Sequence, residues 1–164
     1  FHVTGVQTCA LPICSYLGLD PGTEKTGFDF QSDRLCPWGG ECDNEGMLEI
    51  IADHMTAGDV VAIEKVSVGR VSGREIGETI WWAGRFYEAA VRTGAKVVQV
   101  HRNTVLAHFE TKKLYKPNGD RMNNDAALRQ RLIELLGKDK VPTSSHQRSA
   151  LAVAIVARNQ LEGQ

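Results

Sequence analysis

The sequence predicts a single α/β domain built on a mixed five-stranded sheet with helices on its faces. Two apolar runs, residues 15–20 and 59–66, have the composition of buried strands. Segments between and after them repeat apolar residues every three to four positions, as amphipathic helices do. At 164 residues the chain has the ordinary size of one domain with one core.

The first half of the chain predicts a hairpin followed by a helix. Residues 15–20 and 26–32 are expected to pair as antiparallel strands, because the turn-forming PGTEK lies between them. The turn-rich segment 33–46 has room for an irregular edge strand. An amphipathic helix is expected over 46–58, ended by a glycine.

The second half predicts parallel strands and further helices. The strand 59–66, a long helix over about 74–93 and a strand over 95–101 form a β-α-β unit, whose strands run parallel. Three more helices are expected over 103–110, 125–136 and 145–160, with a basic polar loop over 111–124.

The composition indicates a soluble protein of uneven charge. Hydrophobic residues make up 42% and charged residues 24%, and no apolar run approaches the roughly 18 residues that span a bilayer. Residues 1–64 hold eleven acidic and two basic side chains, whereas residues 65–164 hold nine acidic and seventeen basic ones. This asymmetry is compatible with a polyanion bound at one face, although scattered surface charges produce the same count.

The start of the chain and the cysteines carry no predicted function. Residues 3–13 resemble the read-through translation of a sequencing-library adapter, so we expect residues 1–14 to be a non-native, loosely packed tail before one domain over 15–164. The four cysteines match no zinc-site spacing. Free thiols in a reducing cytoplasm are expected, with a Cys36–Cys42 disulfide as the alternative.

Two acidic residues end the two most apolar strands. Asp20 follows the first strand and Glu64 lies at the end of the strand over 59–66. If these strands are neighbours, the two carboxylates emerge at the same edge, where they repel unless a cation or a proton lies between them. Oxygen ligands of this kind suit Mg²⁺ or Mn²⁺. The structural alternative is that Asp20 closes a turn before Pro21 and that Glu64 only ends its strand.

The last predicted helix brings a third candidate. Ser144 or Ser145 is placed to cap this helix, which puts His146 in its first turn. A neutral imidazole binds Mn²⁺ or Mg²⁺ and also transfers protons. A histidine in a first turn also commonly serves as a surface or capping residue, so this assignment stays open.

Three blocks together resemble one known family. LGLDPGTEKTG, VVAIEKVSVGR and HQRSALAVAIVA resemble, in order and spacing, the signature blocks of RuvC-type Holliday junction resolvases of the ribonuclease H-like superfamily, and look closest to the phage branch. The resemblance spans residues 15–160. It implies a ribonuclease H-like fold and a homodimeric endonuclease that cuts four-way DNA junctions.

The resemblance also implies a metal site. In that family two divalent ions are held by carboxylates or a histidine at the positions matching Asp20, Glu64 and His146, and they hydrolyse the phosphodiester to leave 5′ phosphates. The family often has another aspartate where this chain has Ser149, a departure that puts full activity in doubt. Asp125, otherwise a helix N-cap, is the auxiliary candidate. Because imidazole is a softer ligand than carboxylate, Mn²⁺ is expected to serve at least as well as Mg²⁺.

Basic and apolar surfaces extend these expectations. The helix containing ETIWWAGRFYEAA is apolar over most of its circumference, which predicts core packing together with a two-fold interface. DNA contacts are expected from two groups of basic residues, with a solvated loop as the alternative for the second group. The first group is Lys65, Arg70 and Arg74, and the second is Lys112, Lys113, Lys116 and Arg121.

Other functions remain open. DPGTEKTG also resembles the phosphate-binding turn of actin-like ATPases and sugar kinases, but those proteins need two such domains. A related nuclease of ribosomal RNA maturation shares the first block and fits the others less well. A non-catalytic protein that binds branched DNA is the third alternative, supported by Ser149. In each case we expect a protein of the cytoplasm of a bacterial cell or a phage-infected host.

Overall fold

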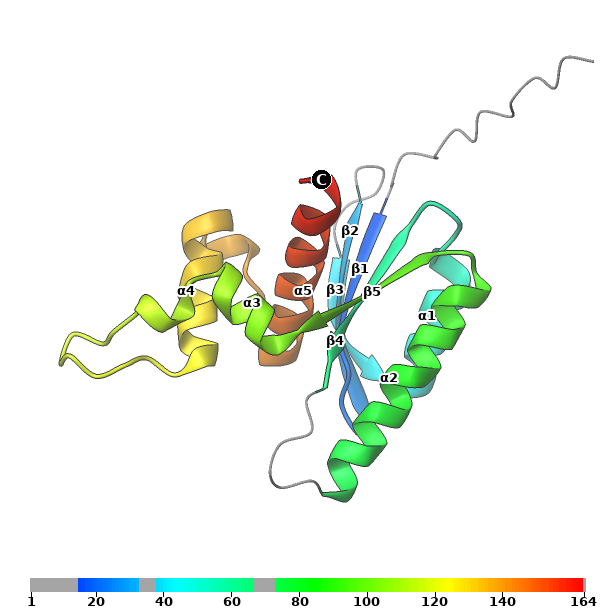
Figure 1. Ribbon diagram of the computed structural model, residues 1–164, viewed down its shortest axis with the longest axis horizontal. Helices are drawn as coiled ribbons and strands as arrows, with labels where there is room; N and C mark the ends of the chain where they lie inside the picture. The colour runs from blue at the N-terminus through cyan, green and yellow to red at the C-terminus, as the bar shows by residue number, and fades with distance from the viewer. Residues whose placement is uncertain (1–14, 33–37, 67–72, 164) are drawn as a thin grey trace, which may run out of the picture.

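The computed structural model describes residues 15–32, 38–66 and 73–163, which form a five-stranded sheet with helices packed on both faces (Figure 1). The order across the sheet is β3-β2-β1-β4-β5. The three strands β1, β2 and β3 pair antiparallel, whereas β4 and β5 run parallel to β1. The predicted mixed sheet is therefore confirmed. The strands are β1 (Ser15–Asp20), β2 (Lys25–Ser32), β3 (Trp38–Asp43), β4 (Val60–Lys65) and β5 (Lys96–His101).

The helices divide between the two faces of the sheet. One face is covered by α1 (Asn44–His54) and α2 (Arg74–Arg92), and the other by α5 (Ser145–Glu162), beside which lie α3 (Arg102–His108) and α4 (Asn124–Leu136) (Figure 1). Short 3₁₀ helices, η1 (Thr111–Lys113) and η2 (Lys138–Lys140), flank α4. Of these, α5 contacts the central strands β1, β2 and β4 directly. The functional candidates on α5 are therefore held against the middle of the sheet.

The helix predicted over 46–58 differs from its prediction at both ends. The helix expected over 46–58 begins at Asn44, because the side chain of Asp43 accepts a hydrogen bond from the backbone N–H of Gly46. It ends at His54, where Asp59 accepts hydrogen bonds from the N–H and hydroxyl of Thr56 and forms a turn instead. Side-chain hydrogen bonds at its two ends, and not the spacing of apolar residues, therefore set the bounds of this helix.

Strand alternation divides the core into two layers. Leu17 and Leu19 of β1 pack with the buried residues of α1 and α2, such as Met47 and Phe86. On the other face, Ala62 of β4 joins the apolar residues of α3, α4 and α5. A residue that alternates with Leu17 and Leu19 therefore faces α5, which applies to Asp20 at the end of β1.

Two glycines let α5 approach the sheet closely. A Cβ at Gly18 would lie 2.0 Å from the backbone oxygen of Ala150, and one at Gly27 would lie 2.4 Å from the backbone carbon of His146. No side chain fits at either position. Since Gly27 pairs directly with Asp20, its missing side chain allows the first turn of α5 to lie over the end of β1.

Several expectations fall outside the described residues. These are the adapter-like tail, the Cys36 partner of the alternative disulfide, and Arg70. Within the ranges that the structure describes, no helix combines the length and apolarity needed to cross a bilayer.

Candidate functional site

The two strand-end carboxylates lie next to each other. Leu19 of β1 pairs with Ile63 of the parallel β4, so the residues that follow them, Asp20 and Glu64, emerge together at one edge of the sheet. Their side chains are only 18% and 14% exposed. The strand order thus brings together two acids that are far apart in the sequence.

The first turn of α5 places His146 beside Asp20. Ser144 caps this helix by accepting a hydrogen bond from the N–H of Gln147, and its hydroxyl donates to Glu41 of β3. His146 Nδ1 lies 3.0 Å from Asp20 Oδ2. This hydrogen bond raises the pKa of His146, so the pair is favoured with a proton between nitrogen and oxygen.

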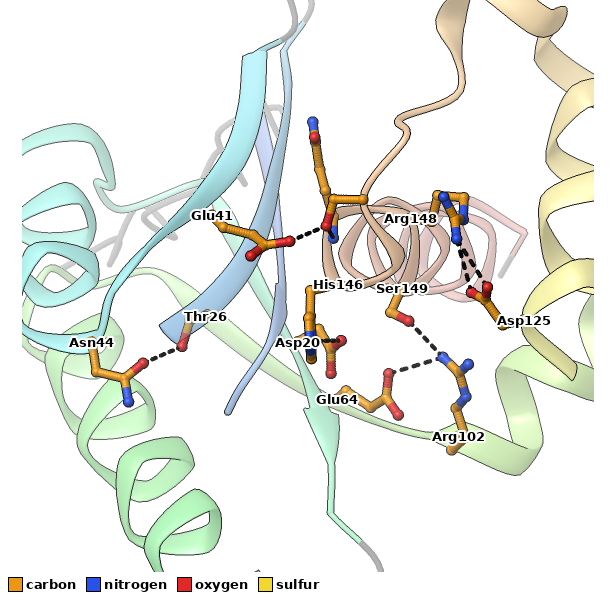
Figure 2. Close-up of polar contacts among 12 residues, drawn as sticks. Asp20, Thr26, Glu41, Asn44, Glu64, Arg102, Asp125, His146, Arg148 and Ser149 are labelled. Atoms are coloured by element: carbon orange, nitrogen blue, oxygen red, sulfur yellow. Dashed lines mark hydrogen bonds and ion pairs between the residues drawn. The ribbon is translucent and has the colours of Figure 1, made fainter. Parts of the chain in front are cut away.

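An arginine that the sequence analysis did not select completes the group. Arg102 Nη1 donates to Ser149 Oγ at 2.8 Å and lies 3.4 Å from Glu64 Oε2 (Figure 2). Arg102 is the first residue of α3 and directly follows β5, which runs parallel to β4. Its place after a parallel strand was the available signal, because such strands end at the same edge of the sheet.

Asp125 lines the pocket but is not the N-cap of α4. The N-cap of α4 is Asn123, whose side chain accepts from the N–H of Ala126, so the N-cap assignment for Asp125 is wrong. Asp125 instead accepts two hydrogen bonds, at 2.9 and 3.2 Å, from the guanidinium of the buried Arg148 on α5. Arg148 also donates to the backbone oxygens of Pro142 and Thr143. This ion pair ties α4 to the start of α5.

The five side chains Asp20, Glu64, Arg102, His146 and Ser149 line one pocket of ≈ 410 Å³, together with Ser145 and Asp125. Burial and the neighbouring Asp20 carboxylate raise the pKa of Glu64 to about 7, although Arg102 opposes the rise. A larger hollow of ≈ 560 Å³ lies between α1 and α2 on the opposite face. It contains a single carboxylate, Glu88, so the smaller pocket is the better candidate for polar chemistry.

The turn after Asp20 is held by a residue that the sequence analysis also missed. Asn44 at the start of α1 donates to the backbone oxygens of Gly22 and Thr23, and accepts from the buried hydroxyl of Thr26 at 2.7 Å (Figure 2). No pattern near Asn44 signals this contact, since it depends on how α1 packs beside the hairpin. The contact fixes the chain direction just beyond the carboxylate.

The predicted DNA-contacting residues fall in two places. Lys65 is exposed and lines a second hollow that shares Asp20, Glu64 and Arg102 with the pocket. Arg74 is exposed and forms an ion pair with Glu78 at 2.7 Å. The second group is exposed on the segment between α3 and α4, which projects away from the sheet (Figure 1). In that group, Lys113 pairs with Glu110 at 2.6 Å.

The donor set fits one divalent cation. Mg²⁺ is commonly bound by one or two carboxylates, with water and substrate phosphate completing its shell. Asp20 and Glu64 supply such a pair, and a cation would relieve the repulsion that raises the pKa of Glu64. Within the described ranges no cluster of three His, Cys, Asp or Glu side chains is arranged to hold a metal. The position beyond Glu64 holds the guanidinium of Arg102, which does not fit a second cation.

Comparison with known proteins identifies the fold. No family model and no curated protein matches the sequence. Among solved structures, the chain is similar to RuvC of Thermus thermophilus at 18% identity, with a TM-score of 0.64 and coverage of 91% of this chain and 96% of that one. A second structure, T. thermophilus RuvC in complex with a Holliday junction substrate, matches with a TM-score of 0.66 at the same identity and coverage. The predicted ribonuclease H-like fold is thereby confirmed as that of RuvC.

Proposed function

We propose that this protein is a metal-dependent endonuclease that cuts four-way DNA junctions by hydrolysing phosphodiesters. The observation that carries the proposal is the pair Asp20 and Glu64, which lie side by side at a sheet edge. The pocket that they line also contains the positively charged side chain of Arg102. The shared fold with RuvC agrees with it. The phage-like branch, the single domain over 15–164 and a cytoplasmic site of action remain predictions from the sequence.

The side chains of the pocket suit phosphodiester hydrolysis. Asp20 and Glu64 would hold a divalent cation, which when bound lowers the pKa of a water molecule and stabilises the leaving oxygen. His146 orients the Asp20 carboxylate through Nδ1. Arg102 presents N–H donors that match a phosphate oxygen. In the reaction, the water oxygen bonds to phosphorus and the bond to the 3′ oxygen breaks; that oxygen takes a proton, leaving a 5′ phosphate and a 3′ hydroxyl.

The test is cleavage of a labelled four-way junction with Mn²⁺ or Mg²⁺. Wild type is expected to cut, whereas Asp20→Asn is expected to bind the junction without cutting it. Asp29→Asn is the matched control, since Asp29 is a buried acid of the adjacent strand β2 that does not line the pocket. Cutting by Asp20→Asn at the rate of the control would contradict the proposal. A strict Mg²⁺ requirement would contradict the expectation from the sequence that Mn²⁺ serves at least as well as Mg²⁺.

A non-catalytic role in binding branched DNA is the second candidate. It is favoured by Ser149, a neutral residue in the pocket whose hydroxyl is engaged by Arg102. Under this alternative, wild type and Asp20→Asn both bind the junction and neither cuts it with either ion. The same assay with an RNA hairpin tests the related nucleases that act on RNA.

Two basic surfaces are proposed to bind the DNA backbone. Lys65 lies next to the pocket, and the projecting segment after α3 adds the exposed Lys112, Lys116 and Arg121. Replacing Lys112 with alanine is expected to reduce the salt slope of junction binding by about 1, as expected for one lost phosphate contact. An unchanged slope would assign Lys112 to a solvated loop.

A homodimer through α2 is proposed as the assembly. Phe86 and Ala90 of α2 are buried in the core, whereas Ile80, Trp81 and Tyr87 are 42%, 58% and 44% exposed. Exposed aromatic and aliphatic residues on one helix are typical of an interface between subunits. Light scattering at micromolar concentration is expected to give a dimer, and a monomer would refute this assembly.

A further inference from the structure

The strongest unexplained contact in the pocket is the one made by Arg102. Its guanidinium bonds the hydroxyl of Ser149 at 2.8 Å and lies 3.4 Å from Glu64, with its side chain 30% exposed. Ser149 is buried on α5, one turn after His146. A fixed positive charge therefore lies on the side of Glu64 away from Asp20 (Figure 2).

The charges of the pocket balance with a single divalent cation. Asp125 is paired one-to-one with Arg148, so neither contributes net charge. The remaining charges are the carboxylates of Asp20 and Glu64, the guanidinium of Arg102 and, when it is protonated, the imidazole of His146. With His146 neutral, one divalent ion together with one phosphodiester brings this set to neutrality, and a protonated His146 adds one more positive charge. A second divalent ion would add two uncompensated charges within a few ångströms of Arg102, which is strongly unfavourable in a partly buried pocket.

We propose that Arg102 occupies the place of a second cation, so that the pocket binds one divalent ion per chain and uses a built-in guanidinium as its other positive group. This inference rests on the proposed nuclease function and departs from the two-ion expectation. Ser149 is essential to it, because its neutral hydroxyl accepts from Arg102 without adding a charge, whereas a carboxylate at the same position would add a negative charge and an oxygen ligand that favour another metal ion.

Binding of Mn²⁺ alone tests the inference without DNA. Equilibrium dialysis at pH 8 is expected to give one Mn²⁺ per chain for wild type, with the electron paramagnetic resonance spectrum of an isolated ion. The double variant Arg102→Ala with Ser149→Asp is expected to bind two Mn²⁺ per chain and to show a spin-coupled pair. Two coupled ions in wild type, or no bound ion, would overturn the inference.

A single substitution keeps the test independent of the double variant's folding. Arg102→Gln removes one positive charge beside the ion and is expected to bind Mn²⁺ about tenfold more tightly. The control is Arg92→Gln, which removes an exposed arginine paired with Glu88 on α2 and should leave the affinity unchanged. Unchanged or weaker binding by Arg102→Gln would mean that Arg102 only positions Glu64, and would refute the proposal.

The outcome is separable from that of the nuclease proposal. A protein that binds one Mn²⁺ but never cuts a junction would refute the nuclease function and support the single-ion pocket. A protein that cuts junctions with two coupled ions bound would support the nuclease function and refute the single-ion pocket.

Discussion

Asp29, which is buried, and Glu64, which is largely buried, are two carboxylates on the same face of the sheet, beneath the first turns of α5. Burial raises the pKa of both, to about 7 for Glu64 and to about 6 for Asp29. Their neighbours differ. Asp29 accepts hydrogen bonds from the neutral amides of Gln31 and Gln147, whereas Glu64 lies beside the carboxylate of Asp20 and the guanidinium of Arg102.

The difference separates a structural acid from a candidate functional one. A buried carboxylate with neutral donors has its hydrogen-bonding needs met and only weakens the fold when it ionises. At Glu64 the neighbouring carboxylate of Asp20 favours a bound cation in the open pocket, and the guanidinium of Arg102 compensates the two negative charges only in part. Burial by itself is therefore a poor guide to function, and the combination found at Glu64 is a better one.

The largest expected effect comes from matched amide substitutions at these two acids. Glu64→Gln removes a charged ligand and is expected to lower junction cutting by roughly 10²–10³-fold, the range for losing one electrostatic contact to a transition state. Asp29→Asn is expected to leave cutting within about twofold of wild type. Initial rates at saturating Mn²⁺ provide the measurement, and equal losses in the two variants would remove the functional distinction between the acids.

A smaller effect is expected on stability, and here Asp29 is the residue that matters. Its pKa in the folded state, about 6, exceeds the ordinary value of 3.8, so its stabilising contribution is present below pH 3.8 and is lost as the pH rises through 6. The Asn side chain of Asp29→Asn cannot ionise. The free energy of unfolding of this variant should therefore exceed that of wild type by about 2–3 kcal/mol at pH 7.5.

Urea unfolding at pH 4 and at pH 7.5 checks this sign. The difference in unfolding free energy between Asp29→Asn and wild type should be small at pH 4 and should increase as the pH rises. A gap that narrows with rising pH would mean that the charged form of Asp29 is the stabilised one.

The smallest expected effect concerns Asp125, the acid on α4 that pairs with Arg148 of α5. Asp125→Asn leaves the buried Arg148 without its anion and should lower the unfolding free energy by about 1–2 kcal/mol, less than for a fully buried pair because Asp125 is 47% exposed. Asp139→Asn, at an exposed position of η2, is the control and should change stability by less than about 0.5 kcal/mol. Equal unfolding midpoints in urea for the two variants would show that Arg148 does not depend on Asp125.

The sequence predicted most elements and part of the site. The strands around Leu17 and Val61 were recognisable because buried strands are continuous apolar runs. A cap at Ser144 or Ser145 followed from their position before an apolar period, and the structure has Ser144. The N-cap role of Asp125 was predicted wrongly, because Asn123 caps α4 and a distant arginine takes the carboxylate. Arg148 has no local signal, because its partner Asp125 lies on another helix, α4.

The sequence alone placed Asp20 at the end of β1 and Glu64 next to the end of β4, because buried strands follow local apolar composition. Only the tertiary structure decided which groups meet there. The absence of a side chain at Gly27 brings His146 over Asp20, and the parallel pairing of β4 with β5 brings Arg102 to Glu64. These contacts join residues that are far apart in the chain, so they depend on how the helices pack on the sheet and leave no pattern in the local sequence.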